Sequence, residues 1–223
     1  MAKELAPISV GRTLAAVRSL MRFATRSGHL AKNVAADLNL PRPENCLAER
    51  ILGEEDVRRI IALETEPRDR VLLLLLYTAG LRVSEACNLR WRNLRARGDA
   101  GQLTVCGKGG KTRAVLLPGE MWKDLLSLDS AGNPDGPVFR SRSGKPLDRS
   151  RVLRIVQEAA QRAGIAGGVS PHWLRHAHAT HSLERGAPIH LVQATLGHAS
   201  VATTSRYLHA RPSQSSAQFI QAR

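Results

Sequence analysis

An unbroken apolar segment in the middle of the chain is the feature that most constrains its fold. Val71 to Leu76 is entirely aliphatic, and the apolar stretch continues to Leu81, with Arg70 and Arg82 bounding it. This length is far short of the roughly 20 residues that cross a bilayer. The segment therefore predicts a helix buried in the core of a globular domain.

The first 45 residues predict a smaller region of their own. Apolar residues recur at helical spacing over about 9–28, where Gly28 is a plausible stop, and a second, short helix is expected over 31–40. The segment 41–45, which begins Pro-Arg-Pro, has the composition of a turn and linker. We therefore expect a domain boundary there, separating residues 1–43 from a larger domain over 44–212 and a tail over 213–223.

The larger domain is predicted to be mainly α with a small antiparallel β-sheet. Two strands are expected over 102–106 and 113–117, joined by the glycine-rich hairpin Gly107-Lys108-Gly109-Gly110-Lys111. The remaining pattern predicts helices over 54–64, 71–79, 84–89, 119–128, 148–163, 171–185, 188–196 and 200–209.

The charge of the chain indicates a polyanionic partner. The sequence has 33 Lys and Arg against 19 Asp and Glu, a formal net charge of +14. A ribosomal protein, a membrane-surface protein and a merely basic soluble protein are the alternatives, and charge alone does not distinguish among these classes. The DNA contacts predicted from the basic clusters and the hairpin are Arg12, Arg18, Arg22, Arg90, Arg92, Lys111, Arg113, Arg140, Arg142, Lys145 and Arg149.

The cysteines and the start of the chain indicate the compartment. Cys46, Cys87 and Cys106 are far apart and lack metal-ligand spacing, which fits a reducing cytosol. The first residues show no apolar signal region. A cytoplasmic protein is the expectation.

The last third of the chain gathers groups suited to breaking a phosphodiester bond. Its motifs are Ser170-Pro171-His172-Trp173-Leu174-Arg175-His176, Leu196-Gly197-His198 and Thr203-Thr204-Ser205-Arg206-Tyr207. Tyr207 can supply a nucleophile, although a phenol with a pKa near 10 needs basic or cationic neighbours. The other tyrosine, Tyr77, lies inside the apolar helix, where packing is the favoured interpretation.

Arginine, histidine and lysine can supply the rest of this chemistry. Arg82 and Arg175 would clamp a phosphate, because guanidinium groups match its oxygens and stay charged. His172 and His176 share a helix face with Arg175. They could also bind zinc, but no cysteine lies near them and no glutamate between them. Lys108 is the candidate general acid and Lys111 the second candidate, although basic hairpins are often only solvated.

The order Arg, Lys, His-x-x-Arg, His, Tyr resembles the tyrosine recombinase (phage integrase) family, most closely its Xer-type and integrase members. The resemblance runs from about Arg12 to His209 and implies the catalytic-domain fold of that family. It implies catalytic roles for Arg82, Lys108, His172, Arg175, His198 and the nucleophile Tyr207, with Glu85 and His176 in support. It also implies that residues 1–43 are a partial helical core-binding (SAM-like) region, shorter than relatives usually carry.

The resemblance further implies a site-specific DNA recombinase that works through a 3′-phosphotyrosine, with no cofactor. Double-stranded DNA would be its partner, bound by a homo-tetramer on paired sites, and accessory DNA-bending proteins or a partner recombinase would be further partners. The tail 213–223 would dock on a neighbouring protomer. Three alternatives stay open: a type IB-like topoisomerase, a non-catalytic DNA-binding remnant of a mobile element, and a zinc hydrolase.

Overall fold

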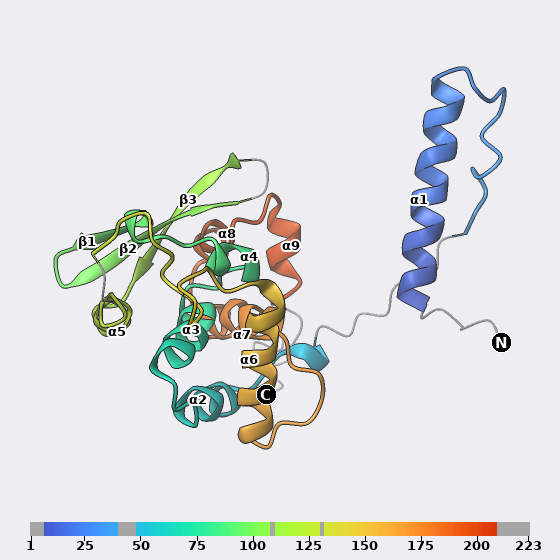
Figure 1. Ribbon diagram of the computed structural model, residues 1–223. Coiled ribbons are helices and arrows are strands. Elements are labelled where there is room, and N and C mark those ends of the chain that lie inside the picture. The colour runs from blue at the N-terminus through green and yellow to red at the C-terminus, as the bar shows by residue number, and fades with distance from the viewer. Residues whose placement is uncertain (1–6, 40–47, 108–109, 130–131, 209–223) are drawn as a thin grey trace, which may run out of the picture. The chain divides into compact units, whose positions relative to one another are not determined.

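The computed structural model describes residues 7–39, 48–107, 110–129 and 132–208 (Figure 1). The chain divides into two compact units, Met1–Cys46 and Leu47–Arg223. The division falls three residues after the boundary expected from sequence. The tail 213–223 lies outside the described residues.

The first unit is built on the helix α1, Pro7–Arg26. Gly28 has a φ of 74°, a left-handed conformation that suits glycine after a helix. The helix expected over 31–40 is wrong within the described residues, because 34–37 form turns instead. Oδ1 of Asn33 accepts the N–H of Ala35 at 3.1 Å, so the side chain takes a donor that would start the helix.

The second unit is mainly helical. Its α-helices are α2 (Glu54–Ala62), α3 (Pro67–Thr78), α4 (Val83–Cys87), α5 (Gly119–Leu126), α6 (Arg149–Arg162), α7 (Pro171–Glu184), α8 (Ile189–Leu196) and α9 (Val201–Ser205), with the 3-10 helices η1 (Ala48–Arg50) and η2 (Trp91–Asn93). The apolar segment forms α3, as expected. Leu72, Leu73, Leu75 and Leu76 are fully buried, so α3 is the centre of the core.

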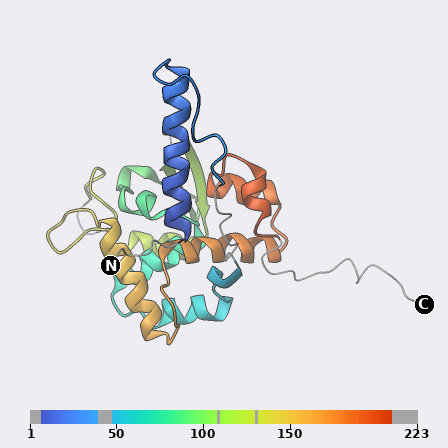
Figure 2. The ribbon, with the colours of Figure 1, turned by 90° about the vertical axis from the view of Figure 1, so that its right-hand side faces the viewer.

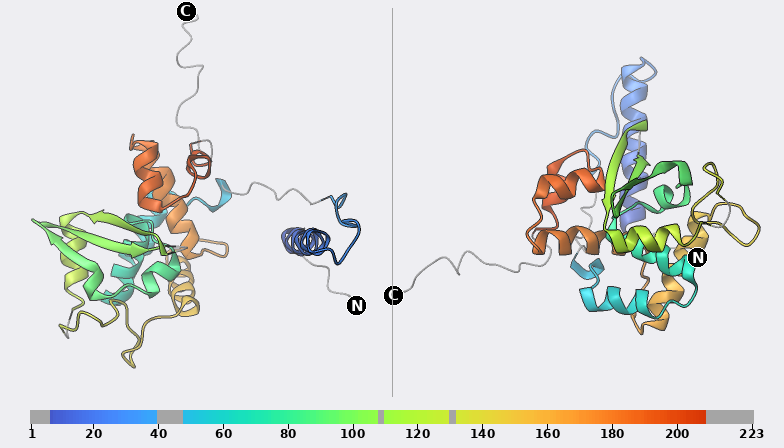
Figure 3. Two further views of the ribbon diagram at one scale, coloured as in Figure 1. Left: turned by 90° about the horizontal axis from the view of Figure 1, so that it is seen from above. Right: turned by 90° about the vertical axis from the view of Figure 1, so that its left-hand side faces the viewer.

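The described residues form one antiparallel sheet of three strands in the order β1 (Leu94–Arg97), β2 (Ala100–Cys106) and β3 (Thr112–Leu117). β1 was not expected from sequence. In the register, Leu103 faces Leu94 on one side and Val115 on the other. α5 packs against β2 (Figures 1 and 3), and Trp122 lies so close to Gly101 that a β-carbon there would be 2.1 Å from the indole.

Four packing contacts of this unit converge on one region. α3 packs against α7, α7 against α8, and α8 against both α9 and β3 (Figure 2). The residue after the C-cap of α3 is Gly80, whose φ of 57° turns the chain into α4. The ends of α3 and α8, the starts of α4 and α7 and one strand thus meet around the sequence motifs.

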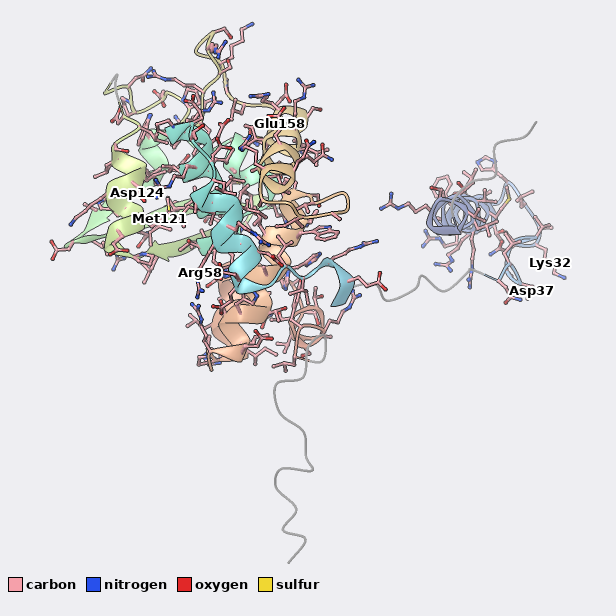
Figure 4. The ribbon with its side chains drawn as sticks, turned by 90° about the horizontal axis from the view of Figure 1, so that it is seen from below. Lys32, Asp37, Arg58, Met121, Asp124 and Glu158 are labelled. Carbon is pink, nitrogen blue, oxygen red and sulfur yellow. The ribbon has the colours of Figure 1, made fainter. Side chains whose placement is uncertain are left out.

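The surface of the second unit carries exposed charged side chains. Figure 4 labels Arg58 on α2 and Glu158 on α6, and both residues are exposed. In the part of the chain that the structure describes, no helix combines the length and the apolar character needed to span a membrane.

Candidate active site

α7 presents the His-x-x-Arg motif from its first turns. Ser170 precedes the helix in an extended conformation, and Pro171 occupies the first helical position. Proline favours this position because its ring fixes φ near the helical value. His172, Arg175 and His176 then lie on one face, since residues three and four apart are neighbours on a helix.

Arg175 is buried, with 3% of its surface exposed. Its guanidinium donates to the carbonyl oxygen of Gly80, and Nη2 donates to that of Leu196 at 2.7 Å. Burial, followed by the charge of Arg82, lowers the pKa of Arg175 to about 10. The side chain therefore stays cationic at neutral pH while it joins the ends of α3 and α8.

Arg82 lies at the start of α4 and donates two hydrogen bonds to Glu85. Its backbone N–H donates to Oε2 of Glu85 at 2.8 Å, and Nη1 donates to Oε1 at 2.9 Å. Nη2 also reaches the carbonyl oxygen of Gly197 at 3.3 Å. The side chain of Arg82 is 33% exposed, so it spans from a buried carboxylate to solvent.

Arg113, predicted as a DNA contact, has a different environment. Nη1 and Nη2 donate to Oε1 and Oε2 of Glu85 at 2.8 and 2.9 Å, and Nε donates to the carbonyl oxygen of Thr195 at 2.6 Å. Its side chain is only 12% exposed. Because each guanidinium nitrogen donates to an acceptor inside the protein, Arg113 links β3 to Glu85 and to the end of α8.

Glu85 is the anion at the centre of this arrangement. Burial raises the pKa of Glu85, but the hydrogen bonds from Arg113 and Arg82 act against it, and the net result is a lowered pKa. The carboxylate is therefore ionised at neutral pH. It accepts from two arginines that come from β3 and α4.

Tyr207 follows α9 and is 6% exposed. Its hydroxyl lies 2.8 Å from Nδ1 of His176. Burial raises the pKa of Tyr207, while Arg175 and Arg206 act in the opposite direction. Burial, His172 and Arg175 lower the pKa of His176 to about 4. At neutral pH a protonated phenol thus faces an uncharged imidazole, which can accept its proton at Nδ1.

The other two histidines of the motifs flank this pair. The rings of His198 and Tyr207 are nearly parallel with centroids 6.3 Å apart, and those of His172 and His176 stack at 5.9 Å. Nδ1 of His198 lies 2.9 Å from Oγ1 of Thr204. Burial and then Arg175 lower the pKa of His198 to about 4, and desolvation followed by Arg175 lowers that of His172.

The structure thus brings together the described members of the predicted catalytic set, which are Arg82, His172, Arg175, His198 and Tyr207, with Glu85 and His176 beside them. Lys108 lies outside the described residues. Lys111 is exposed, and its carbonyl oxygen accepts the N–H of Gly107 at 2.8 Å, which closes the hairpin.

Tyr77 lies in another environment. Its hydroxyl is 3.0 Å from Nδ1 of His181, which is 3% exposed, and burial raises the pKa of Tyr77. His181 lies five residues beyond His176 on α7, or roughly one and a half turns. The contact packs α3 against α7.

The remaining predicted DNA contacts are distributed over both units. Arg12 and Arg22 are exposed on α1, where Arg18 is half-buried. Arg90 and Arg92 both bond to Asp135, the first to its carbonyl oxygen and the second to its carboxylate. Exposed basic side chains in and after the loop before α6 are Arg140, Arg142, Lys145 and Arg149.

The zinc alternative has no support among the described residues, where no group of three or more His, Cys, Asp or Glu could hold a metal ion.

Sequence reasoning missed the groups that hold the site in place. These are the carbonyl oxygens of Gly80, Thr195, Leu196 and Gly197, together with the hydroxyl of Thr204. Backbone carbonyls leave no mark in a sequence. The two glycines are the available signal. Both have positive φ, and Gly80 lies two residues before Arg82, while Gly197 directly precedes His198.

Comparison with known proteins gives consistent matches. Residues 50–214 match the phage integrase family. The chain is 38% identical over 213 residues to tyrosine recombinase XerC of Xylella fastidiosa (strain M23), covering 93% of this chain and 71% of that protein.

Among solved structures, the crystal structure of XerA recombinase is 30% identical, with a TM-score of 0.66, and covers 96% of this chain and 82% of that one. The XerH site-specific recombinase bound to difH substrate, a pre-cleavage complex, is 25% identical with a TM-score of 0.62. That match covers 78% of this chain and 53% of the other.

Proposed function

The chain belongs to the phage integrase family and is a site-specific DNA recombinase, and from this premise we propose that Tyr207 is its nucleophile. The phenolic oxygen bonds to the scissile phosphorus, and the bond from phosphorus to the 5′-oxygen breaks. The products are a 3′-phosphotyrosine and a free 5′-hydroxyl. A 5′-hydroxyl from a partner strand then reverses the step and releases Tyr207, through a Holliday junction.

The observation that carries this proposal is the contact between Tyr207 and His176. The 2.8 Å separation places a neutral imidazole where the phenol proton must go as the oxygen attacks. The same helix carries Arg175 and His172 beside it. His172, stacked on His176, would assist the proton transfer.

Two arginines and a histidine would stabilise the charge that develops on the phosphate. Arg175 is held by two carbonyl groups, which leave further N–H donors for a phosphate oxygen. Arg82 is oriented by Glu85, and its side chain is partly exposed. His198, whose ring lies nearly parallel to that of Tyr207, completes the set. Preorganised donors of this kind give large rate effects in acyl and phosphoryl transfer.

Protonation of the leaving 5′-oxygen is assigned to Lys108, with Lys111 as the second candidate. The support is chemical: an alkoxide is a poor leaving group, and the sequence of the hairpin between β2 and β3 carries both amines. The scheme needs neither metal nor nucleotide, because the phosphotyrosine conserves the energy of the broken bond.

DNA binding would extend beyond the site. We assign phosphate contacts to Arg12, Arg18 and Arg22 on α1, to Arg90, Arg92 and Lys111, and to Arg140, Arg142, Lys145 and Arg149. Residues 1–43 would act as a partial core-binding region and residues 44–212 as the catalytic domain. Recombination between two duplexes needs four cleavages, so a tetramer on paired sites is proposed, together with accessory DNA-bending proteins or a partner recombinase.

A covalent-trap assay tests the proposal. The protein is incubated in EDTA with nicked duplexes from a genomic pool, so that the short 5′-hydroxyl fragment diffuses away and the phosphotyrosine is stranded. Denatured samples are scored for protein–DNA adduct, with Tyr207→Phe and Tyr77→Phe alongside. Adduct in the wild type and in Tyr77→Phe, but not in Tyr207→Phe, is expected.

Two results would count against the proposal. Adduct that persists in Tyr207→Phe would move the nucleophile elsewhere. Intact DNA binding without adduct in any variant would indicate a non-catalytic binding protein. Sequencing the trapped DNA identifies the site, whereas relaxation of any supercoiled plasmid would favour a topoisomerase.

A further inference from the structure

Arg113 is buried beside the candidate site, yet the proposed chemistry gives it no part. It lies on β3, directly opposite Val105 on β2, at the base of the hairpin that carries the two candidate lysines. Its guanidinium is paired with the carboxylate of Glu85 and donates to Thr195, whereas that of Arg175 donates only to uncharged carbonyl groups. The hydrogen bonds of Arg113 connect the strand at the base of the hairpin to α4 and α8.

The described start of the hairpin packs on the Arg113–Glu85 pair. A β-carbon added at Gly107 would lie 3.8 Å from Nη1 of Arg113 and 4.0 Å from Oε1 of Glu85. Gly107 also closes the hairpin through its bond to Lys111. Gly107, which directly precedes Lys108 in the sequence, therefore lies beside the ion pair.

The opposite side of Arg113 contacts the loop of the second histidine. Nε donates to Thr195, and a β-carbon at Gly197 would lie 3.1 Å from Cδ of Arg113. Gly197 directly precedes His198 and accepts from Arg82. One side chain thus fixes β3, α4 and the end of α8 relative to one another.

We propose that Arg113 is a positioning residue, which anchors the described base of the lysine-bearing hairpin to Glu85 and so governs the step that the general acid performs. The bidentate pair fixes both distance and orientation, which a lysine at this position could not do. This inference rests on the proposed role of Lys108 as general acid.

The test compares a normal leaving group with one that needs no acid. Nicked duplexes are made with either oxygen or sulfur at the 5′-bridging position of the scissile phosphate. A thiol ionises near pH 8.5, so sulfur leaves without being protonated. Single-turnover rates of adduct formation are measured for Arg113→Lys, Lys108→Ala and the wild type. The matched control is Arg58→Lys, since Arg58 is 65% exposed on α2 and pairs within its own helix (Figure 4).

Arg113→Lys is expected to slow cleavage of the oxygen substrate about 10²-fold, in the range for general acid catalysis. The sulfur substrate should bring it to within about threefold of the wild type, as it should for Lys108→Ala. Arg58→Lys should match the wild type on both. If Arg113→Lys does not fold, as judged by thermal unfolding, Arg113→Gln takes its place.

Each other outcome has a defined meaning. Equal losses of Arg113→Lys on both substrates, with Lys108→Ala rescued, would overturn the positioning role and leave the general acid intact. Wild-type rates on both substrates would overturn it as well. A Lys108→Ala enzyme that sulfur does not rescue would instead remove Lys108 as general acid, and with it the premise of this inference.

Discussion

At the scale of single residues, the phenol of Tyr207 depends on His176 as the acceptor of its proton. We expect His176→Phe to slow adduct formation about 10²-fold or more, because an aromatic ring is kept while the proton acceptor is lost. The hydroxyl of a 6% exposed tyrosine would also lose its partner, which costs about 1–3 kcal/mol of stability. Single-turnover cleavage and urea unfolding measure the two effects.

His181→Phe is the matched control for this prediction. His181 forms the corresponding contact with Tyr77 at 3.0 Å, so its loss should lower stability to a similar extent and leave the cleavage step of the folded protein unchanged. Similar slowing by both variants would show that His176 acts only through packing.

The predicted site residues differ in how far the sequence could specify them. Arg82, Arg175 and Tyr207 could be singled out because each lies at a fixed spacing from other reactive groups in the motifs. Arg113 carries the same charge as the surface arginines around it, and nothing near it in sequence marks it as buried. Its acceptors, Glu85 on α4 and Thr195 on α8, are 28 and 82 residues away, and only the tertiary structure brings them to β3.

At the scale of elements, the turn between α3 and α4 depends on Gly80. Its φ is 57°, and a β-carbon there would lie 2.7 Å from Cδ2 of His178 and 2.8 Å from Cδ2 of Leu196. Gly80→Ala should therefore cost about 2–4 kcal/mol, from the left-handed backbone plus overpacking. It should also displace the carbonyl that holds Arg175 and reduce cleavage.

Gly186→Ala separates the two contributions. Gly186 follows α7 with a φ of 83°, but no atom lies within 4 Å of the added carbon. Only the backbone cost of about 1–2 kcal/mol is expected, with normal cleavage. Equal destabilisation by the two variants in urea unfolding would refute the packing argument.

The strand that was not predicted and the helix that was predicted wrongly both have local explanations. β1 is an edge strand of only 4 residues, too short for its alternation of apolar and basic residues to predict a strand, and charged residues protect sheet edges from further pairing. Leu30, Val34 and Leu38 have helical spacing, but the side chain of Asn33 accepts the backbone N–H of Ala35, and Val34 is 75% exposed. A segment this short has little helical stability without packing.

At the scale of the whole molecule, the buried histidines make the larger unit sensitive to acid. The pKa values of His176, His178 and His198 are lowered from 6.5 to about 4, with burial as the largest cause. Between these values the unfolded chain binds protons that the folded chain does not, so stability falls as the pH falls. Glu85, with a lowered pKa, adds to the loss only below its usual value of 4.5.

Urea unfolding followed by tryptophan fluorescence measures this effect, because Trp91, Trp122 and Trp173 all lie in the larger unit. From pH 7 to pH 5 we expect a loss of about 1 kcal/mol per histidine, discounted for partial exposure. His178→Asn should reduce the loss by about that amount. An unfolding free energy that is constant over this range would contradict the prediction.

The net charge of +14 makes a prediction for the whole DNA-binding surface. If about six to ten phosphates are neutralised, affinity should fall about 10³- to 10⁵-fold between 50 and 200 mM salt. Arg142 is exposed and Arg113 is enclosed by acceptors, so the two should differ although their charges are equal. Arg142→Gln should reduce the slope of log K against log salt by about one unit, whereas Arg113→Gln should leave it unchanged.

Fluorescence anisotropy of a labelled duplex over a salt series measures both slopes. A reduced slope for Arg113→Gln would return Arg113 to the DNA contacts, because only a side chain that displaces counterions from phosphate changes this quantity.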